Sequence, residues 1–187
     1  MDYSLPADQV PQPRGAGAAS APVYPVYLGL GSNLGDRQGQ LRAALAGLHG
    51  LPGVRLGRVS PLYESAPWGV TDQPAFLNAV AEGWTTLAPH SLLHAVKALE
   101  VVAGREVGPR WGPRPLDIDL LLYDDQAVNT PDLVIPHPRL SERRFVLAPL
   151  ADLWPAWHDA AGQPIQALLQ AVADQPLTQV ATGRWWA

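Results

Sequence analysis

Residues 116–123 read LDIDLLLY, an apolar segment interrupted only by Asp117 and Asp119. Side chains two residues apart lie on the same face of a β-strand, so the two carboxylates project together while Ile118 and Leu120 project from the opposite face. The pattern predicts a strand with one buried apolar face and one acidic face. Aspartate is uncommon in strands, so this pair indicates a binding or catalytic role.

The sequence before this strand predicts a helix followed by a loop. Pro89 occupies a first-turn position, and apolar residues recur at helical spacing from Leu92 to Val102, before Gly104. Residues 105–115 then contain two glycines and three prolines, which is typical of a loop.

Similar signals continue toward the N-terminus. Residues 26–30 predict a buried strand, and residues 36–50 carry leucines spaced four and three apart, as on one face of a helix. Residues 54–63 and 76–84 predict two further strands, separated by a loop rich in proline and glycine at 65–74. The element order is therefore βαββαβ, which predicts an α+β fold of the ferredoxin-like type, an antiparallel sheet with helices on one face.

The two ends of the chain extend this core. Residues 126–135 are expected to add short edge strands, and residues 141–150 and 163–173 two C-terminal helices. Residues 1–22 are rich in proline, alanine and glycine and predict a flexible tail, which leaves 23–187 as one domain.

Composition excludes several classes of function. The chain has 187 residues, 47% of them hydrophobic and 16% charged, which suits a single hydrophobic core. Its net charge of −4 argues against sequence-independent binding of nucleic acid, which needs a basic surplus. The absence of cysteine removes disulfides, thiolate zinc sites and cysteine nucleophiles.

The apolar segments are also too short to cross a bilayer, which takes about 20 residues. The N-terminal sequence lacks the basic region and apolar core of a signal peptide. We therefore expect a cytoplasmic protein without a membrane partner, and a monomer.

The charged residues around the acidic strand indicate a nucleotide site. Two carboxylates about 7 Å apart on a rigid strand suit Mg²⁺, which binds one or two carboxylates together with substrate phosphates. Arg110 and Arg114 offer guanidinium groups that match phosphate geometry, and His137 lies in a restricted loop between two prolines. Residues 105–144 hold six of the twelve arginines. The alternative is a solvated strand face whose aspartates are balanced by arginines.

Two common nucleotide motifs are absent. No G-x-x-x-x-G-K-[ST] sequence occurs, which argues against a P-loop enzyme. Residues 29–35 read GLGSNLG and miss the G-x-G-x-x-G spacing of dinucleotide folds, so they are interpreted mainly as a tight turn from strand to helix.

Several segments together resemble the 6-hydroxymethyl-7,8-dihydropterin pyrophosphokinases of folate biosynthesis, over about residues 24–158. The segments are LGLGSNLG at 28–35, DQPAFLN at 72–78, GR at 104–105, RWGPRPLDID at 110–119, PH at 136–137 and RRF at 143–145. The run RWGPR followed by LDID is the most specific of them.

The resemblance implies transfer of pyrophosphate from the co-substrate ATP to the hydroxymethyl oxygen of the pterin, with release of AMP. It implies that Asp117 and Asp119 bind two Mg²⁺ ions bridging the triphosphate, and that Arg105 and Arg114 face the phosphates. These four residues are the expected catalytic residues. The ATP-binding residues implied by the resemblance are Lys97, Glu100, Arg110, Trp111, Arg114, Leu120, His137 and Arg143.

The resemblance also implies how the pterin binds. Phe76 and Phe145 would stack on the two faces of the flat ring, and Asn78 would hydrogen-bond its amide edge. The other residues implied to contact the pterin are Ser65, Ala66, Trp68 and Trp111.

Two other functions remain open at this point. A two-metal phosphohydrolase could use the same carboxylates, although such enzymes commonly surround their metals with more acids or histidines. A non-catalytic RNA-binding module could share the topology, but it would need stacking aromatics on the sheet and a basic surface. Hydrolysis without pterin would favour the first, and tight, salt-sensitive binding of RNA the second.

Overall fold

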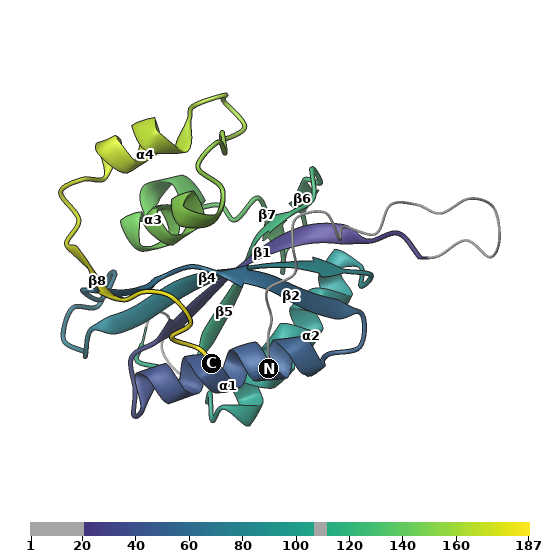
Figure 1. Ribbon diagram of the computed structural model, residues 1–187, viewed down its shortest axis with the longest axis horizontal. Helices are drawn as coiled ribbons and strands as arrows, with labels where there is room; N and C mark the ends of the chain where they lie inside the picture. The colour runs from purple at the N-terminus through teal and green to yellow at the C-terminus, as the bar shows by residue number, and fades with distance from the viewer. Residues whose placement is uncertain (1–20, 107–111) are drawn as a thin grey trace.

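A mixed sheet-and-helix architecture is seen in the computed structural model, which describes residues 21–106 and 112–187 (Figure 1). Strand β1 (Tyr24–Ser32) pairs antiparallel with β4 (Phe76–Thr85) from Tyr24 opposite Thr85 to Ser32 opposite Leu77. Strand β5 (Asp117–Tyr123) pairs antiparallel with the other side of β1. These three strands form the centre of the sheet.

On its other side β4 pairs with two shorter strands, β2 (Val54–Val59) and β3 (Leu62–Ser65). Helix α1 (Arg37–Gly50) connects β1 to β2, and α2 (Pro89–Val102) connects β4 to β5. The predicted α+β class with an antiparallel sheet is confirmed, and the strand order is consistent with the ferredoxin-like arrangement.

The sheet has helices on both faces (Figure 1). Helices α1 and α2 cover one face, whereas α3 (Arg144–Leu153) and α4 (Ile165–Ala171) lie on the other. Each side has its own cluster of buried apolar residues. The prediction of helices on one face therefore holds for α1 and α2 only, because the C-terminal helices bury their apolar residues against the opposite face.

The two core helices begin and pack as their sequences predict. Asp36 Oδ1 accepts a hydrogen bond of 2.9 Å from Gly39 N and so caps the start of α1. The leucines at the predicted spacing, Leu41, Leu45 and Leu48, are all buried. Pro89 is the first residue of α2, where its missing N–H breaks no helical hydrogen bond.

The strand predicted at 54–63 is divided in two at Ser60 and Pro61. Proline has no N–H to donate to a ladder, so it interrupts the pairing. Ser60 compensates, because its Oγ accepts a hydrogen bond of 3.0 Å from Val80 N and its own N–H donates to Val80 O at 2.9 Å. The chain therefore bends here while β2 and β3 both stay paired with β4.

Residues 126–135 form two short strands, β6 (Val128–Asn129) and β7 (Val134–Ile135), which pair with each other in a sheet of their own. The prediction that they are edge strands of the main sheet was wrong in this respect. A short 3-10 helix, η2 (Leu140–Glu142), precedes α3. None of the helices in the described ranges is both long and apolar enough to cross a membrane. Residues 1–20 of the predicted tail lie outside the described residues.

The C-terminal strand β8 (Leu177–Ala181), which pairs antiparallel with β3, was not predicted from the sequence. Beyond it, the indole of Trp185 is 5% exposed and its Nε1 donates a hydrogen bond of 2.8 Å to Ser60 O. The carbonyl of Trp185 accepts from Arg42 Nε at 2.7 Å. The C-terminus is thus anchored both to α1 and to the bend between β2 and β3.

We predict that Trp185→Ala lowers the free energy of unfolding by about 3–5 kcal/mol, because it removes a buried indole and leaves a cavity. Trp186→Ala is the control, since Trp186 is only partly buried. Urea unfolding followed by circular dichroism measures both. Equal losses in the two variants would contradict the anchoring role of Trp185.

Candidate active site

A pocket opens where the centre of the sheet meets the start of α3 and the loop that follows β3. Its empty volume is about 670 Å³, part of it open to solvent. It brings together residues from both predicted binding sites. The predicted site residues that line it are Ser65, Ala66, Trp68, Phe76, Asn78, Arg114, Asp117, Asp119, Arg143 and Phe145.

Glycines in β1 keep the floor of the pocket open. A Cβ atom added to Gly31 would lie 3.5 Å from Asn78 Oδ1 and 3.8 Å from Phe76 Cδ1, and one added to Gly29 would lie 3.3 Å from Leu121 Cδ2. Both glycines therefore belong to the strand and shape the pocket. The interpretation of residues 29–35 as mainly a turn was incomplete, since only Gly35 has the positive φ, 63°, of a tight turn.

The carboxylates of Asp117 and Asp119 lie on the pocket face of β5, as predicted. Asp117 Oδ1 accepts a hydrogen bond of 2.6 Å from Arg105 Nη1, and Asp117 Oδ2 is 3.4 Å from Arg114 Nε. Burial, and next the negative charge of Asp117, raises the pKa of Asp119 to about 6. The two carboxylates therefore repel each other, and a cation between them would relieve that repulsion.

Two arginines at the site have a buried Nε that makes no hydrogen bond, although Arg114 Nε lies in an ion pair 3.4 Å from Asp117 Oδ2. Among the described residues, Arg114 Nε and Arg143 Nε have no hydrogen-bond partner. Burial lowers the pKa of Arg143, while the charge of Asp119 acts in the opposite direction. Buried guanidinium nitrogens without partners are costly, and an anion with several oxygen acceptors would satisfy them.

The donor set fits a magnesium ion that is shared with a polyphosphate. The described part of the chain contains no group of three or more histidine, aspartate or glutamate side chains arranged to hold a metal. Mg²⁺ does not need such a group, because it commonly binds one or two carboxylates and completes its shell with phosphates and water. Asp117 and Asp119, which line the pocket together, meet that requirement.

Glu100 and Lys97 contact protein groups behind the acidic strand. The side chain of Glu100 is buried, and its Oε1 accepts from Ile118 N at 2.7 Å and from Lys97 Nζ at 2.8 Å. Its Oε2 lies 2.7 Å from Arg105 Nη1. Glu100 thus fixes both the backbone between the two aspartates and the arginine that pairs with Asp117. Contact of Glu100 and Lys97 with ATP stays a prediction.

The other predicted ATP-site residues lie around the aspartates or outside the described residues. His137 Nδ1 accepts from Arg139 N at 3.2 Å, and its Nε2 is 4.0 Å from Asp119 Oδ2. Burial, and next the charge of Arg143, lowers the pKa of His137 to about 4, so the imidazole is neutral at pH 7. The side chain of Leu120 is buried in the core. Arg110 and Trp111 fall in the undescribed residues 107–111.

The aromatic residues form the opposite end of the pocket. Each phenylalanine lies near a guanidinium, with Arg114 Cζ 5.8 Å from the ring centre of Phe76 and Arg143 Cζ 5.6 Å from that of Phe145. The indole of Trp68 meets Phe145 edge-on, with ring centres 6.4 Å apart. The aromatic and charged ends of the pocket are therefore in direct contact.

Asn33, which is 1% exposed, has a role in the site that was not predicted from the sequence. Its Nδ2 donates to Gln73 Oε1 at 3.0 Å and to Pro74 O at 3.1 Å, and its Oδ1 accepts from Arg114 N at 2.8 Å. One carboxamide thus joins the loop after β3 to the residue that carries a site guanidinium. The available signal was a carboxamide residue directly after a buried strand.

We predict that the metal-free Asp119→Asn variant is more stable than the metal-free wild type, and that the difference grows as pH rises. The folded-state pKa of Asp119 is about 6, above the unfolded value of 3.8, so ionisation between these values costs the folded state stability. Asparagine does not ionise, so the variant does not lose this stability. Its advantage over the wild type is small at pH 4 and grows to about 1–2 kcal/mol at pH 8, after allowance for solvent screening of a side chain that is 35% exposed.

Urea unfolding in EDTA at pH 4 and pH 8 measures this difference. An equal difference at the two pH values would contradict the raised pKa of Asp119.

Comparisons with known proteins identify the family. A family model for 7,8-dihydro-6-hydroxymethylpterin-pyrophosphokinase (HPPK) matches residues 27–155. A 2-amino-4-hydroxy-6-hydroxymethyldihydropteridine pyrophosphokinase of Pseudomonas aeruginosa is 48% identical over 146 residues, which cover 78% of this chain and 90% of that protein. The enzyme of the same name from Bacillus subtilis is 46% identical over 127 residues, which cover 68% of this chain and 76% of that one.

Larger proteins contain a similar unit. A mitochondrial folate synthesis bifunctional protein of Arabidopsis thaliana is 47% identical over 150 residues, which cover 75% of this chain and only 27% of that protein. A crystal structure of HPPK-DHPS in complex with substrates superposes with a TM-score of 0.67 at 12% identity, over 82% of this chain and 44% of that one. This similarity shows the fold, and the family model and the curated relatives show that the chain belongs to the 7,8-dihydro-6-hydroxymethylpterin-pyrophosphokinase family.

Proposed function

We propose that this protein transfers the pyrophosphoryl group of ATP to the hydroxymethyl oxygen of 6-hydroxymethyl-7,8-dihydropterin in folate biosynthesis. The hydroxyl loses its proton as its oxygen bonds to the β-phosphorus, the bond from the β-phosphorus to the bridging oxygen breaks, and AMP leaves with that oxygen. One observation carries the proposal. A single pocket has aromatic rings and a buried carboxamide at one end, and two carboxylates with two guanidinium nitrogens that make no hydrogen bond at the other.

The aromatic end suits a flat heterocycle with a hydrogen-bonding edge. Asn78 is 5% exposed, and its Nδ2 donates to Ser65 Oγ at 3.0 Å, which fixes the orientation of the amide. Its Oδ1 lies over Gly31, where the absence of a side chain leaves room for a ligand. We propose that Phe76 and Phe145 stack on the pterin, and that Asn78 with the backbone of Ser65, Ala66 and Trp68 reads its edge.

The charged end suits a triphosphate. We propose that Asp117 and Asp119 hold two Mg²⁺ ions, which when bound supply charge neutralisation at the transferred phosphoryl group. Arg114 and Arg143 would donate their Nε–H groups, which make no hydrogen bond within the protein, to phosphate oxygens. Arg105 orients Asp117 through the hydrogen bond of 2.6 Å between them. Arg110, Trp111, His137 and the backbone of Leu120 are proposed to complete the ATP site.

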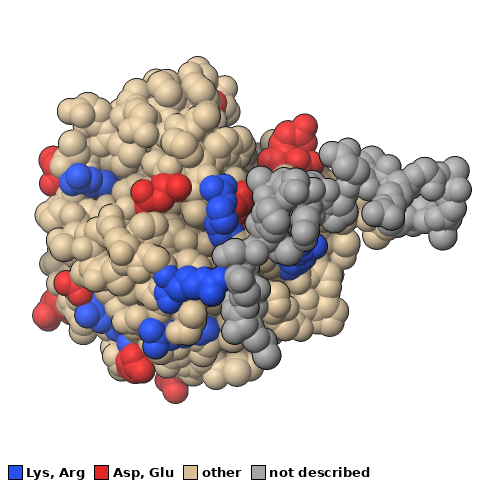
Figure 2. Space-filling model, viewed as in Figure 1, with Lys and Arg blue, Asp and Glu red and all other residues tan. Residues whose placement is uncertain are grey.

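The cytoplasmic location, the monomeric state and the single domain at 23–187 remain predictions from the sequence. On the face drawn in Figure 2, basic and acidic side chains are dispersed over a mostly neutral surface. This distribution gives no support on that face to an RNA-binding module, which needs a continuous basic surface.

The direct test identifies the nucleotide product. With Mg-ATP and the reduced hydroxymethylpterin, we expect one AMP for each pterin diphosphate formed, and no turnover in excess EDTA. Chromatography of the quenched reaction measures both products. Formation of ADP, or no turnover, would contradict the proposal, and steady ATP hydrolysis without pterin would favour a phosphohydrolase.

We predict that Asp117→Ala and Asp119→Ala each lower kcat by roughly 10²-fold or more, because each removes a carboxylate that neutralises the site through a metal ion. Both variants should stay folded, since neither side chain belongs to the core. Asp125→Ala, at an exposed turn after β5, is the matched control. Turnover like that of the wild type in both site variants would refute the assignment of the metal ligands.

A further inference from the structure

The C-terminal strap, which we define as residues 173–177, connects α4 to β8 and lies beyond the residues matched by the family model. It contains no residue that lines the pocket. It nevertheless contacts the two elements that form opposite walls of the pocket, the start of α3 and the end of β3.

The first contact is a helix cap. Arg144 is the first residue of α3, so its N–H has no acceptor within the helix, and the residue before it provides no side-chain cap. Gln175 supplies the acceptor from 31 residues away, because its Oε1 accepts from Arg144 N at 2.9 Å. Its Nε2 also donates to Glu142 O at 2.8 Å. One side chain therefore holds the residues on both sides of Arg143.

The guanidinium of Arg144 strengthens this attachment. Its Nη1 donates to Ala173 O at 2.9 Å and to Gln175 O at 2.8 Å. The side chain of Gln175 thus bonds to the backbone of Arg144, and the side chain of Arg144 bonds to the backbone of the strap. Arg143 and Phe145, the neighbours of Arg144, both line the pocket.

The second contact lies two residues further along the strap. Leu177 pairs with Ser65 in the ladder between β3 and β8. Ser65 begins the wall that continues to Trp68, and the ring of Trp68 meets Phe145 across the pocket with centres 6.4 Å apart. The span from Gln175 to Leu177 therefore connects the start of α3, which carries Phe145, to the end of β3, which leads to Trp68.

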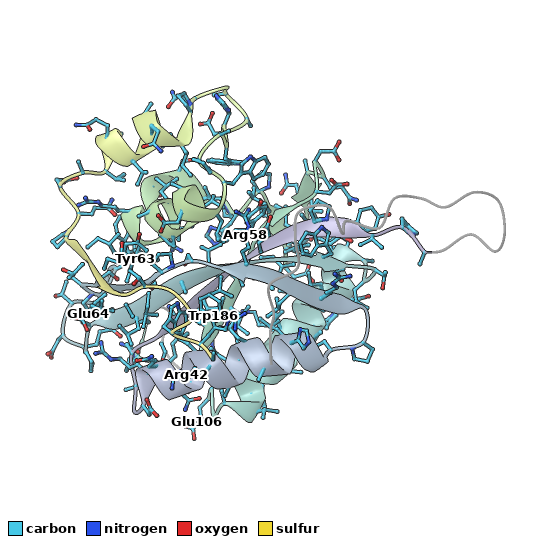
Figure 3. All side chains as sticks on the ribbon, in the orientation of Figure 1. Arg42, Arg58, Tyr63, Glu64, Glu106 and Trp186 are labelled. Carbon is cyan, nitrogen blue, oxygen red and sulfur yellow. The ribbon has the colours of Figure 1, made fainter. Side chains whose placement is uncertain are left out.

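Other contacts hold the rest of α3 to the sheet. Tyr63 OH donates to Asp152 Oδ2 at 2.6 Å, and Arg58 Nη2 donates to Leu153 O at 2.7 Å, both near the C-terminal end of the helix (Figure 3). At the N-terminal end, which carries the pocket residues, the hydrogen bonds with Ala173 and Gln175 attach the helix to the strap.

We propose that Gln175 is a positioning residue that sets the place of Phe145 and Arg143 relative to the wall at Ser65 and Trp68, and thereby the affinity for the pterin. The proposal rests on the function proposed above. Gln175 touches no reacting group and acts only through the start of α3.

The test compares Gln175→Ala with Gln175→Glu and with the matched control Gln179→Ala. Glutamate retains the oxygen that accepts from Arg144 N, and a negative charge is favoured at a helix N-terminus. It lacks the Nε2 group that donates to Glu142 O, so it separates the cap from that second bond. Gln179 is the same residue type on neighbouring β8, and its Oε1 lies 3.4 Å from Tyr63 OH, away from the start of α3.

We expect Gln175→Ala to raise the KM for the pterin roughly three- to tenfold, because Phe145 at the start of α3 shifts. The kcat at saturating pterin should change less than about threefold, because the proposed metal ligands stay in place. Gln175→Glu should recover only part of the lost affinity for the pterin, because it keeps the acceptor for Arg144 N and lacks the donor to Glu142 O. Gln179→Ala should leave the pterin KM unchanged. An unchanged pterin KM in a folded Gln175→Ala variant, or no rescue by glutamate, would overturn the proposal.

Hydrogen exchange followed by NMR separates this proposal from the proposed function. Exchange of the amide of Arg144 should accelerate in Gln175→Ala and stay unchanged in Gln179→Ala, whether or not the pterin is the substrate. Absence of AMP formation by the wild type would refute the function alone, whereas unchanged exchange would refute the cap. If Gln175→Ala does not fold, Arg144→Gln is the second variant, because it removes only the guanidinium contacts with the strap. It should raise the pterin KM by a smaller factor. An unchanged KM would refute the positioning role of the strap.

Discussion

The carboxamide of Asn33 is the contact on which the arrangement of the site depends. It lies at the end of β1, buried, and its donors hold Gln73 and Pro74 while its oxygen holds the backbone of Arg114. A carboxamide is suited to this position because it has both donors and an acceptor, and because it carries no charge that burial would penalise. The loop of the aromatic end and the arginine of the charged end are therefore positioned by one side chain on a rigid strand.

The charged end of the pocket is assembled at a cost in stability. Asp119 has a raised pKa, and Arg114 and Arg143 each keep a buried Nε that makes no hydrogen bond. Such groups destabilise the protein when no ligand is bound. Bound cations would neutralise the carboxylates, and a bound polyanion would accept hydrogen bonds from the guanidinium groups. Glu100 and Arg105 stabilise the arrangement from behind, since Glu100 holds both the backbone of β5 and Arg105. This combination is typical of a functional site, where local repulsion is maintained by the surrounding fold.

Much of this could be predicted from the sequence, because the relevant patterns are local. The alternation around Asp117 and Asp119 and the helical spacing of the leucines gave the core elements. What could not be predicted depends on contacts distant in sequence. Examples are the bond from Gln175 to α3, the pairing of β8 with β3, and Gly31 as pocket floor, which requires knowing what lies opposite β1. The placement of α3 and α4 on the second face also depends on tertiary packing, because an amphipathic sequence does not specify which face of a sheet the helix covers.

The central claim is that one pocket binds the metal-bound triphosphate beside the aspartates and the pterin between the phenylalanines. The most direct measurement is a crystal structure of the protein with Mn²⁺, a non-hydrolysable ATP analogue and the pterin. We predict anomalous scattering from manganese next to Asp117 and Asp119, phosphate oxygens at Arg114 Nε and Arg143 Nε, and the pterin ring between Phe76 and Phe145. Manganese bound away from the two aspartates, or a pterin outside this pocket, would contradict the account.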